Sequence, residues 1–177
     1  MEGAGHVGAA TSVRRAPRRR YRGAMGDTRT PLIRRLGGGD ASRAAELNAL
    51  FAIAFEDEGS YAARRPATAY LERVLADPGV LALVAEVDGE VVGGLVAYEL
   101  RKLEQERSEV YLYDLAVAEA HRRRGVATAL IRELCALARE RGAWVVFVQA
   151  DHGDDAAIAL YTKLGAREDV LHFDIGV

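Results

Sequence analysis

The chain has little cysteine and histidine. It contains one cysteine, Cys135, and four scattered histidines among its 177 residues. A single thiol excludes a disulfide framework and a cysteine-based metal cluster. Histidines that form no close pair argue against a zinc site. We therefore expect a protein that binds no metal.

Long apolar runs are also missing. No uninterrupted stretch approaches the ~20 apolar residues that a membrane helix needs, and the first residues lack the apolar core of a signal peptide. Half of the residues are apolar, 28% are charged and the formal net charge is −2. This composition predicts a single globular domain with a substantial core, located in the cytoplasm and without a membrane partner.

Charge is divided unevenly along the chain. Residues 1–35 contain nine arginines and two acidic residues, a balance of +7, whereas residues 36–177 contain 15 basic and 24 acidic residues, a balance of −9. The acidic body should attract cations. Residues 1–27, rich in arginine, glycine and alanine, predict a disordered leader before a domain over residues 28–177. Nucleic-acid contact by this leader is the alternative, but we favour a solvated segment and expect no nucleic-acid partner.

Hydrophobic periodicity and turn residues predict the element order β-α-α-β-β-β-α-β-α-β. Strands are expected at Thr30–Leu36, Val80–Val87, Val91–Leu100, Glu109–Val117, Trp144–Gln149 and Arg167–Ile175. Helices are expected from Asp40 or Ser42 to about Phe55, and at Ala69–Ala76, Val126–Arg141 and Ala156–Lys163. The helix crossover makes the fourth and fifth strands parallel. This order is an α/β (α+β) fold with a mixed sheet of about six strands and flanking helices, in which the apolar fifth strand is central and covered on both faces.

The segment from Leu115 to Thr128 carries the clearest chemistry. A strand ends, a short turn follows, and Gly125 opens the longest helix, so several unpaired backbone N–H groups and the helix dipole meet there. Such a turn suits a phosphate, and Gly125 removes the side chain where backbone and ligand approach. Three arginines, Arg122, Arg123 and Arg124, add positive charge. The loop is neither a Walker A loop nor a three-glycine dinucleotide loop, and a solvated basic turn is the alternative.

Two motifs carry a resemblance to a known family. The pattern Arg122-x-x-Gly125-x-Ala127 after a strand resembles the acyl-CoA diphosphate loop of the GNAT N-acetyltransferase superfamily. The run from Asp154 to Gly165 resembles the next signature of that superfamily, in which a tyrosine faces the CoA sulfur. Longer segments over residues 28–175 resemble the aminoglycoside 3-N-acetyltransferases of the gentamicin-resistance type, namely Arg107–Val117, His121–Ile131, Val148–Asp155, Ala159–Gly165 and His172–Asp174.

This resemblance implies a GNAT fold and acetylation of the 3-amino group of gentamicin-type aminoglycosides by acetyl-CoA, which would confer resistance. It implies that acetyl-CoA is held by the backbone of Leu115, Ala116 and Val117 and by the loop residues Arg122, Arg123, Arg124, Gly125, Val126, Ala127 and Thr128. The Val117 N–H would polarise the thioester carbonyl, and Tyr161 would protonate the departing thiolate. The implied partner is a small-molecule aminoglycoside, and no metal is needed. A homodimer is one of the oligomeric states that the sequence leaves open.

Carboxylates should line the site of a polycationic drug. Asp114 lies beside the carbonyl-polarising backbone, so we prefer it as the base or as the group that orients the amine. Glu109 is five residues away and lies on the opposite face of an undistorted strand, unless a bulge intervenes. At least one carboxylate of the loop is also expected to bind substrate; its members are Asp151, Asp154 and Asp155.

Each of these roles has a structural alternative. Tyr161 could only pack, Asp114 could only accept hydrogen bonds at the strand edge, and the loop acids could be solvated or cap a helix. Two other functions stay open. One is a GNAT enzyme for another amine, such as a polyamine or a protein amino terminus, and the other is a non-catalytic CoA-binding sensor.

Overall fold

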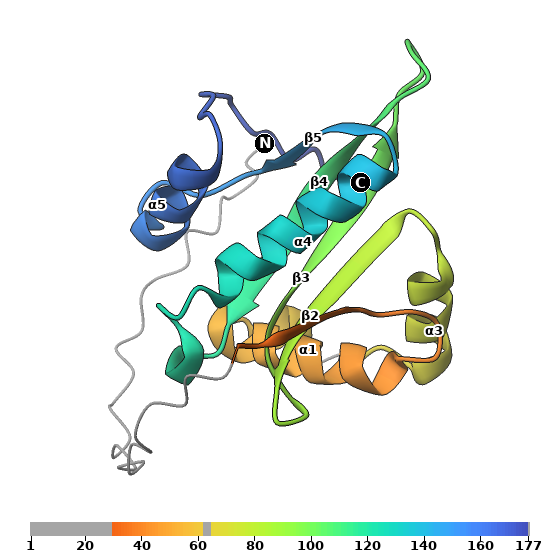
Figure 1. The fold of residues 1–177 in the computed structure, drawn as a ribbon, viewed down its shortest axis with the longest axis vertical. Helices are drawn as coiled ribbons and strands as arrows, with labels where there is room; N and C mark the ends of the chain where they lie inside the picture. The colour runs from red at the N-terminus through yellow and green to blue at the C-terminus, as the bar shows by residue number, and fades with distance from the viewer. Residues whose placement is uncertain (1–29, 62–64, 177) are drawn as a thin grey trace, which may run out of the picture.

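The computed structural model describes residues 30–61 and 65–176; the predicted leader, residues 1–27, lies outside the described residues. A five-stranded mixed sheet forms the centre of the fold (Figure 1). Neighbouring strands are antiparallel except the last pair, which is parallel as predicted. The strands lie in chain order and are β1 (Leu32–Arg35), β2 (Val80–Val87), β3 (Glu90–Arg101), β4 (Ser108–Val117) and β5 (Ala143–Val148).

The helices cover both faces of this sheet. The four predicted helices are present, as α1 (Ala41–Ala54), α3 (Thr68–Ala76), α4 (Val126–Glu140) and α5 (Asp155–Leu164). Two short elements were not predicted, α2 (Glu58–Tyr61) and the 3₁₀ turn η1 (Glu119–His121). Elements of three or four residues are too short to show a helical period, so hydrophobic spacing does not reveal them.

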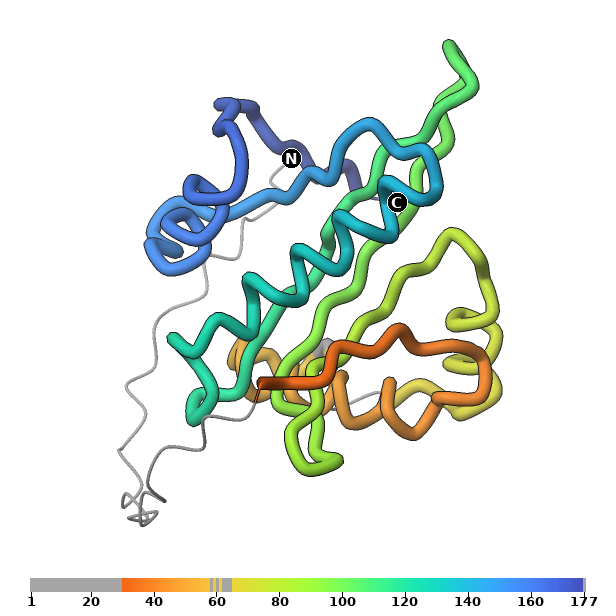
Figure 2. Tube along the Cα trace, viewed as in Figure 1, coloured from red at the N-terminus to blue at the C-terminus, as the bar shows by residue number. Residues whose placement is uncertain are grey.

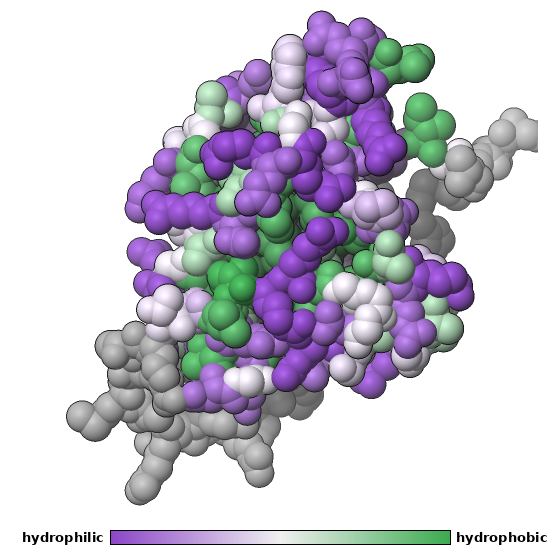
Figure 3. All heavy atoms as spheres, turned by 45° about the vertical axis from the view of Figure 1, so that its right-hand side comes forward, coloured by the Kyte–Doolittle hydropathy of each residue, from purple (hydrophilic) through white to green (hydrophobic). Residues whose placement is uncertain are grey.

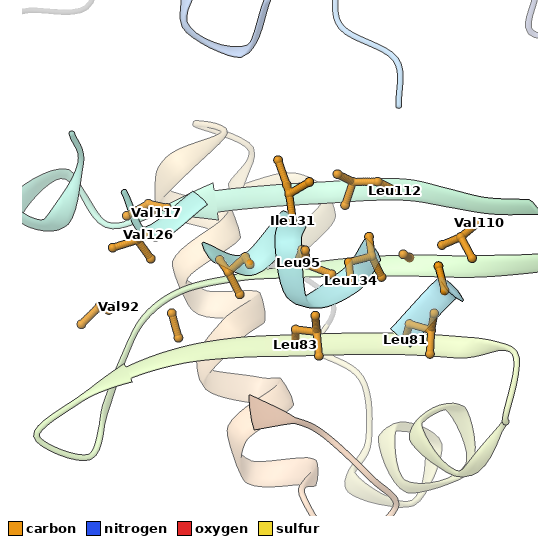
Figure 4. Packing of buried hydrophobic residues seen from close by; sticks show 14 residues of the cluster. Leu81, Leu83, Val92, Leu95, Val110, Leu112, Val117, Val126, Ile131 and Leu134 are labelled. Carbon is orange, nitrogen blue, oxygen red and sulfur yellow. The ribbon is translucent and has the colours of Figure 1, made fainter. Parts of the chain in front are cut away.

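One core lies between the sheet and α4. Figure 4 shows Ile131 and Leu134 of α4 beside Leu83, Leu95 and Leu112 of the sheet. Ile131 and Leu134, like the other buried residues of α4, follow the i, i+3, i+4 spacing that makes one face of this helix apolar. The second core lies on the other face, where α1 and α3 pack on β2 through residues such as Leu47, Phe51, Leu75 and Val84. The sheet is therefore buried on both faces along its middle strands.

Two glycine positions shape the fold around β3. The β2–β3 hairpin turns at Asp88 and Gly89, whose φ angles are +53° and +82°, as the sequence Asp-Gly predicts for a two-residue turn. Within β3, a Cβ on Gly94 would lie 2.5 Å from Leu47 Cδ1 and 2.6 Å from the Leu83 carbonyl oxygen. Gly94 therefore allows α1 to lie directly on the sheet beside the end of β4.

The fifth predicted strand is not central. β5 is the edge strand of the sheet, and Trp144 is 68% exposed. In the part of the chain that the structure describes, the Trp144 ring is not covered by a layer of helices. It is contacted by the guanidinium group of Arg107, which lies 4.2 Å from the centre of the ring. The prediction of a central strand was wrong because an apolar run shows only that its side chains favour contact with other side chains. It does not show that helices cover both faces of the strand or that strands flank it on both sides.

The last predicted strand, Arg167–Ile175, is also wrong in this structure, which describes no strand in that segment. Its large side chains are turned outward, with Leu171 84% and Phe173 77% exposed. A strand needs a hydrogen-bonding neighbour, and this segment pairs with none of the described strands. The trace in Figure 2 shows that this segment turns back after α5, and Figure 3 shows that hydrophobic side chains reach the surface among hydrophilic ones.

Candidate active site

The C-terminal half of β4 has an open edge. β4 pairs with β3 along its whole length but with β5 only from Ser108 to Leu112. The Ala118 N–H donates to the Val92 carbonyl of β3. Because neighbouring residues of a strand point their N–H groups to opposite sides, the N–H groups of Val117 and Leu115 point away from β3, into the gap that β5 leaves. Of the three residues whose backbone was predicted to hold acetyl-CoA, Leu115 and Val117 direct their N–H groups into this gap, whereas the Ala116 N–H faces β3.

The turn between β4 and α4 is the second part of this edge. Arg122 Nε donates to the Val117 carbonyl at 3.0 Å, which ties the turn to the end of β4. Arg123 and Gly125 both have positive φ, +64° and +81°, so the chain bends sharply before α4. The three arginines of the turn, Arg122–Arg124, are exposed.

The first turn of α4 leaves backbone donors uncapped. The first intrahelical bond of α4 runs from the Ala129 N–H to the Gly125 carbonyl, and no side chain caps the helix. The three preceding N–H groups, of Val126, Ala127 and Thr128, therefore have no helical acceptor. A Cβ on Gly125 would meet nothing within 4 Å, so the space above this turn is open. Donors, helix dipole and open space fit a diphosphate, the group that the sequence motif implies.

A bulge in β4 decides which face Asp114 occupies. Asp114 pairs with Val96 while Leu112 pairs with Ala97, so Tyr113 is an extra residue in β4. Leu112 packs in the α4 core and Ala116 in the α1 core. Asp114, two residues before Ala116, therefore lies on the α1 face, and Glu109 shares that face despite the spacing of five.

Glu109 nevertheless lies far from Asp114. Five residues of strand separate the two carboxylates by about 15 Å. Glu109 forms ion pairs with Arg107 at 3.2 Å and Lys102 at 3.6 Å near the β3–β4 hairpin. The structure therefore does not bring the two acids together, and Glu109 already has two cationic partners.

Tyr61 contacts Asp114 and was not predicted. Its hydroxyl group donates to Asp114 Oδ1 at 2.7 Å. Burial raises the pKa of Asp114 above its usual value, and the Tyr61 hydrogen bond partly opposes this effect. Burial and the Asp114 charge raise the pKa of Tyr61 well above its ordinary value, so its hydroxyl stays a donor. The two residues are 53 positions apart and belong to different elements, so no local pattern could have revealed the contact.

A row of aromatic rings extends across the sheet beside Asp114. Tyr98 of β3 meets Tyr113 edge to face at 5.8 Å, Tyr113 meets Tyr111 at 5.6 Å, and Tyr111 stacks on Phe147 of β5 at 4.9 Å. The Asp114 charge helps to raise the pKa of both Tyr98 and Tyr111, after the larger effect of burial. Tyr113 is 59% exposed, so this row combines an accessible aromatic ring with a nearby carboxylate.

Tyr161 lies on the other side of the open edge. It is partly buried against the α4 core, whereas Asp114 and Tyr61 lie on the α1 side. Burial, and secondarily the Asp154 charge, raise the pKa of Tyr161 to about 12. The phenol therefore stays protonated at neutral pH and can donate a proton or hydrogen bond.

The acidic loop before α5 has mixed roles. Asp154 is the N-cap of α5 and accepts a hydrogen bond from the Ala157 N–H at 3.0 Å, which confirms one of the two alternatives for this residue. Asp155 begins the helix, and both Asp155 and Asp151 are exposed. Exposed carboxylates at these two positions are available to a cation.

The described residues contain no group of three or more histidine, cysteine, aspartate or glutamate side chains that could hold a metal ion. In the same part of the chain, none of the helices has the length and apolar character needed to cross a membrane.

A family model matches most of the chain. The model described as the acetyltransferase (GNAT) family matches residues 46–166, a range that includes Asp114, the α4 turn and Tyr161. Among curated proteins, N-acetyltransferase 8B of Rattus norvegicus is 31% identical over 99 residues, 56% of this chain and 45% of the relative. The chain thus spans less than half the length of this relative.

Solved structures give longer matches. An aminoglycoside acetyltransferase from an uncultured soil metagenomic sample is 53% identical, with a TM-score of 0.82, over 84% of this chain and 99% of the other. A second aminoglycoside acetyltransferase from such a sample, solved in complex with sisomicin, is 31% identical, with a TM-score of 0.78, over 84% of this chain and 97% of the other.

Proposed function

We propose that this chain, which belongs to the GNAT acetyltransferase family, acetylates the 3-amino group of gentamicin-type aminoglycosides and so confers resistance to them. The observation that carries the proposal is the half-buried Asp114 carboxylate beside exposed tyrosine rings at the open edge of β4. The similarity to a 53% identical aminoglycoside acetyltransferase supports the same substrate class.

GNAT enzymes use acetyl-CoA, which supplies the acetyl group as a thioester. In this chain the N–H groups of Val126, Ala127 and Thr128 and the positive charge of Arg122–Arg124 would hold the diphosphate. The N–H groups of Leu115 and Val117 that point away from β3 would bind the pantetheine arm of acetyl-CoA. The Val117 N–H would polarise the carbonyl under attack.

The acceptor amine must be neutral when it attacks, although most amines of the drug are protonated near neutral pH. Asp114 would accept this proton or orient the amine, directly or through a water. Burial favours that role, because the raised pKa of Asp114 makes its carboxylate a stronger base. Tyr161, protonated at neutral pH, would donate to the departing thiolate.

The remaining parts of the substrate would meet carboxylates and aromatic rings. Tyr113 and Tyr111 present ring surface on which the apolar face of a sugar or cyclitol can lie. Exposed Asp151 and Asp155 would attract further ammonium groups, and Asp154 would add charge while it caps α5. Glu109 is paired with Lys102 and Arg107 and would not contact the drug; it would contribute only negative charge to the region. A linear polyamine would use the carboxylates but not the rings, so we do not favour that alternative.

The test is a thiol-release assay with acetyl-CoA and three acceptors: gentamicin, spermidine and a peptide with a free amino terminus. We expect turnover of gentamicin, with NMR of the product placing the acetyl group on the 3-amino nitrogen. Turnover should weaken as salt rises, because residues 36–177 carry a net charge of −9 and the drug is a polycation. Acetylation of a different amine, or of the peptide or spermidine alone, would refute the assignment.

A homodimer and a cytoplasmic location belong to the same proposal. The outer edge of β5, which pairs with none of the described strands, and the exposed side chains of Leu171 and Phe173 support a contact with a second copy. Light scattering of the purified protein would measure its mass directly, and a monomer at micromolar concentration would remove the dimer from the proposal.

A further inference from the structure

The Tyr61 ring is anchored independently of Asp114. It lies 5.8 Å from the Phe51 ring and 5.6 Å from the Phe55 ring, edge-on or tilted to both. Phe51 is fully buried in the α1 core. Phe51 belongs to α1 and Phe55 directly follows it, so the Tyr61 ring packs against the end of this helix while its hydroxyl group reaches Asp114 of β4.

The Asp114 carboxylate accepts a hydrogen bond from this hydroxyl group. Among the described residues, Tyr61 is the donor that reaches its carboxylate, and no lysine or arginine forms an ion pair with it. Among the described residues, the titratable side chains around Asp114 are Tyr61 from α2, Tyr98 from β3, and Tyr111 and Tyr113 from β4, and the Asp57 charge also acts on Tyr61. A half-buried carboxylate that has no cationic partner in this part of the chain is oriented by the few hydrogen bonds that it accepts.

We propose that Tyr61 is a positioning residue, which holds Asp114 by Oδ1 so that its second oxygen faces the acceptor amine. This inference rests on the proposed function, in which Asp114 receives or orients that amine. A carboxylate free to rotate would present its oxygens to the amine in many orientations, and small displacements at a reacting centre lower the rate steeply. The hydroxyl also stabilises the ionised carboxylate, the form that can take a proton.

The experiment compares four enzymes with the wild type in the thiol-release assay from pH 5.5 to 9. They are Tyr61→Phe, Asp114→Asn, the double variant, and Tyr70→Phe as the matched control. Tyr70 is an exposed tyrosine of α3 whose ring contacts Arg73. Removal of its hydroxyl group in Tyr70→Phe should therefore leave activity unchanged. Tyr61→Phe keeps the ring on Phe51 and Phe55, and thermal unfolding will verify that the variant folds.

We expect Tyr61→Phe to lower kcat/KM about tenfold, mainly through kcat, the scale of one lost hydrogen bond to a charged group. The acid limb of the pH profile should move up by about one pH unit. In the Asp114→Asn background, Tyr61→Phe should cause no further loss, because Tyr61 acts through that carboxylate. Unchanged kcat/KM in Tyr61→Phe would show that Tyr61 only packs, and an additive loss with an unchanged pH profile would show that its hydroxyl acts independently of Asp114; either result would overturn the proposal.

A second measurement does not depend on turnover. Carbon-13 NMR of aspartate-labelled protein follows the titration of the Asp114 carboxyl, identified by its absence in Asp114→Asn. We expect its midpoint to rise in Tyr61→Phe and to stay in place in Tyr70→Phe. An unchanged midpoint in Tyr61→Phe overturns the inference whatever the substrate is. If the wild type acetylates none of the amines, the proposed function fails, while the titration still decides whether Tyr61 holds Asp114.

Discussion

Gly125 offers the most selective test of where acetyl-CoA binds. Its φ angle is +81°, and the space around a Cβ at this position is open. Gly125→Val would force an L side chain into the left-handed region, at a cost of about 1–2 kcal/mol. For a chain of this size, such a loss lowers Tm by about 2 to 8 °C. The two methyl groups would also occupy the approach to the first turn of α4.

The expected loss of affinity is larger than the loss of stability. If the methyl groups keep the diphosphate away from even one of the three uncapped N–H groups at the start of α4, one charge-assisted hydrogen bond is lost. Such a bond contributes about 1.5–3 kcal/mol, so the Kd for CoA should rise about 10- to 100-fold. Isothermal titration calorimetry with CoA measures this change in the folded variant.

The same helix supplies the control. Gly142, just after the other end of α4, has a φ of +77° and equally open surroundings. Gly142→Val should therefore lower Tm by a similar amount, about 22 Å from the proposed diphosphate site, and leave CoA affinity unchanged. Equal losses of affinity in both variants would mean that destabilisation alone weakens binding. Normal affinity in folded Gly125→Val would place the diphosphate elsewhere.

Three further substitutions separate the proposed roles. Asp114→Asn should lower kcat/KM for gentamicin by ~10²-fold, with a smaller loss at high pH, where more of the amine is neutral. Since burial raises the pKa of Asp114, its protonated form favours the folded state, and that contribution is lost as pH rises through the folded-state pKa. The Asn variant should therefore gain in Tm relative to wild type as pH rises from the ordinary aspartate pKa through the folded-state pKa of Asp114; a variant that loses Tm relative to wild type as pH rises through this range contradicts the reasoning. Tyr161→Phe should lower kcat by roughly 10²-fold and barely change the KM for acetyl-CoA, whereas full activity would leave Tyr161 with a packing role. Asp151→Asn should raise the KM for gentamicin at constant kcat, and a fall in kcat measured with saturating drug would make that loop part of the chemistry.

Local signals were sufficient for most of the fold. The apolar spacing on α4, the Asp88-Gly89 turn and the motif at Gly125 each act within a few residues, so the corresponding elements could be predicted. The parallel pairing of β4 and β5 also followed, because a helix crossover leaves few other topologies.

Predictions that depend on a partner strand or layer were less secure. The apolar pattern of Trp144–Gln149 and the alternation of Arg167–Ile175 are properties of one segment, whereas the position of a strand in a sheet depends on which other segments lie beside it. In the structure the first is an edge strand and the second pairs with no described strand.

The sequence by itself determined the helix start at Gly125, the position of Tyr161 in the α5 motif and the acidic character of the domain, because each depends on residue type and near neighbours. Only the tertiary structure decided the surroundings of Asp114. The bulge at Tyr113 places the Asp114 side chain on the α1 face of the sheet. The packing of the segment after α1 brings the Tyr61 hydroxyl group, 53 residues away in the chain, within 2.7 Å of Asp114 Oδ1. Burial and long-range hydrogen bonds set the pKa and orientation of a carboxylate, and both arise only when distant segments of the chain have packed together.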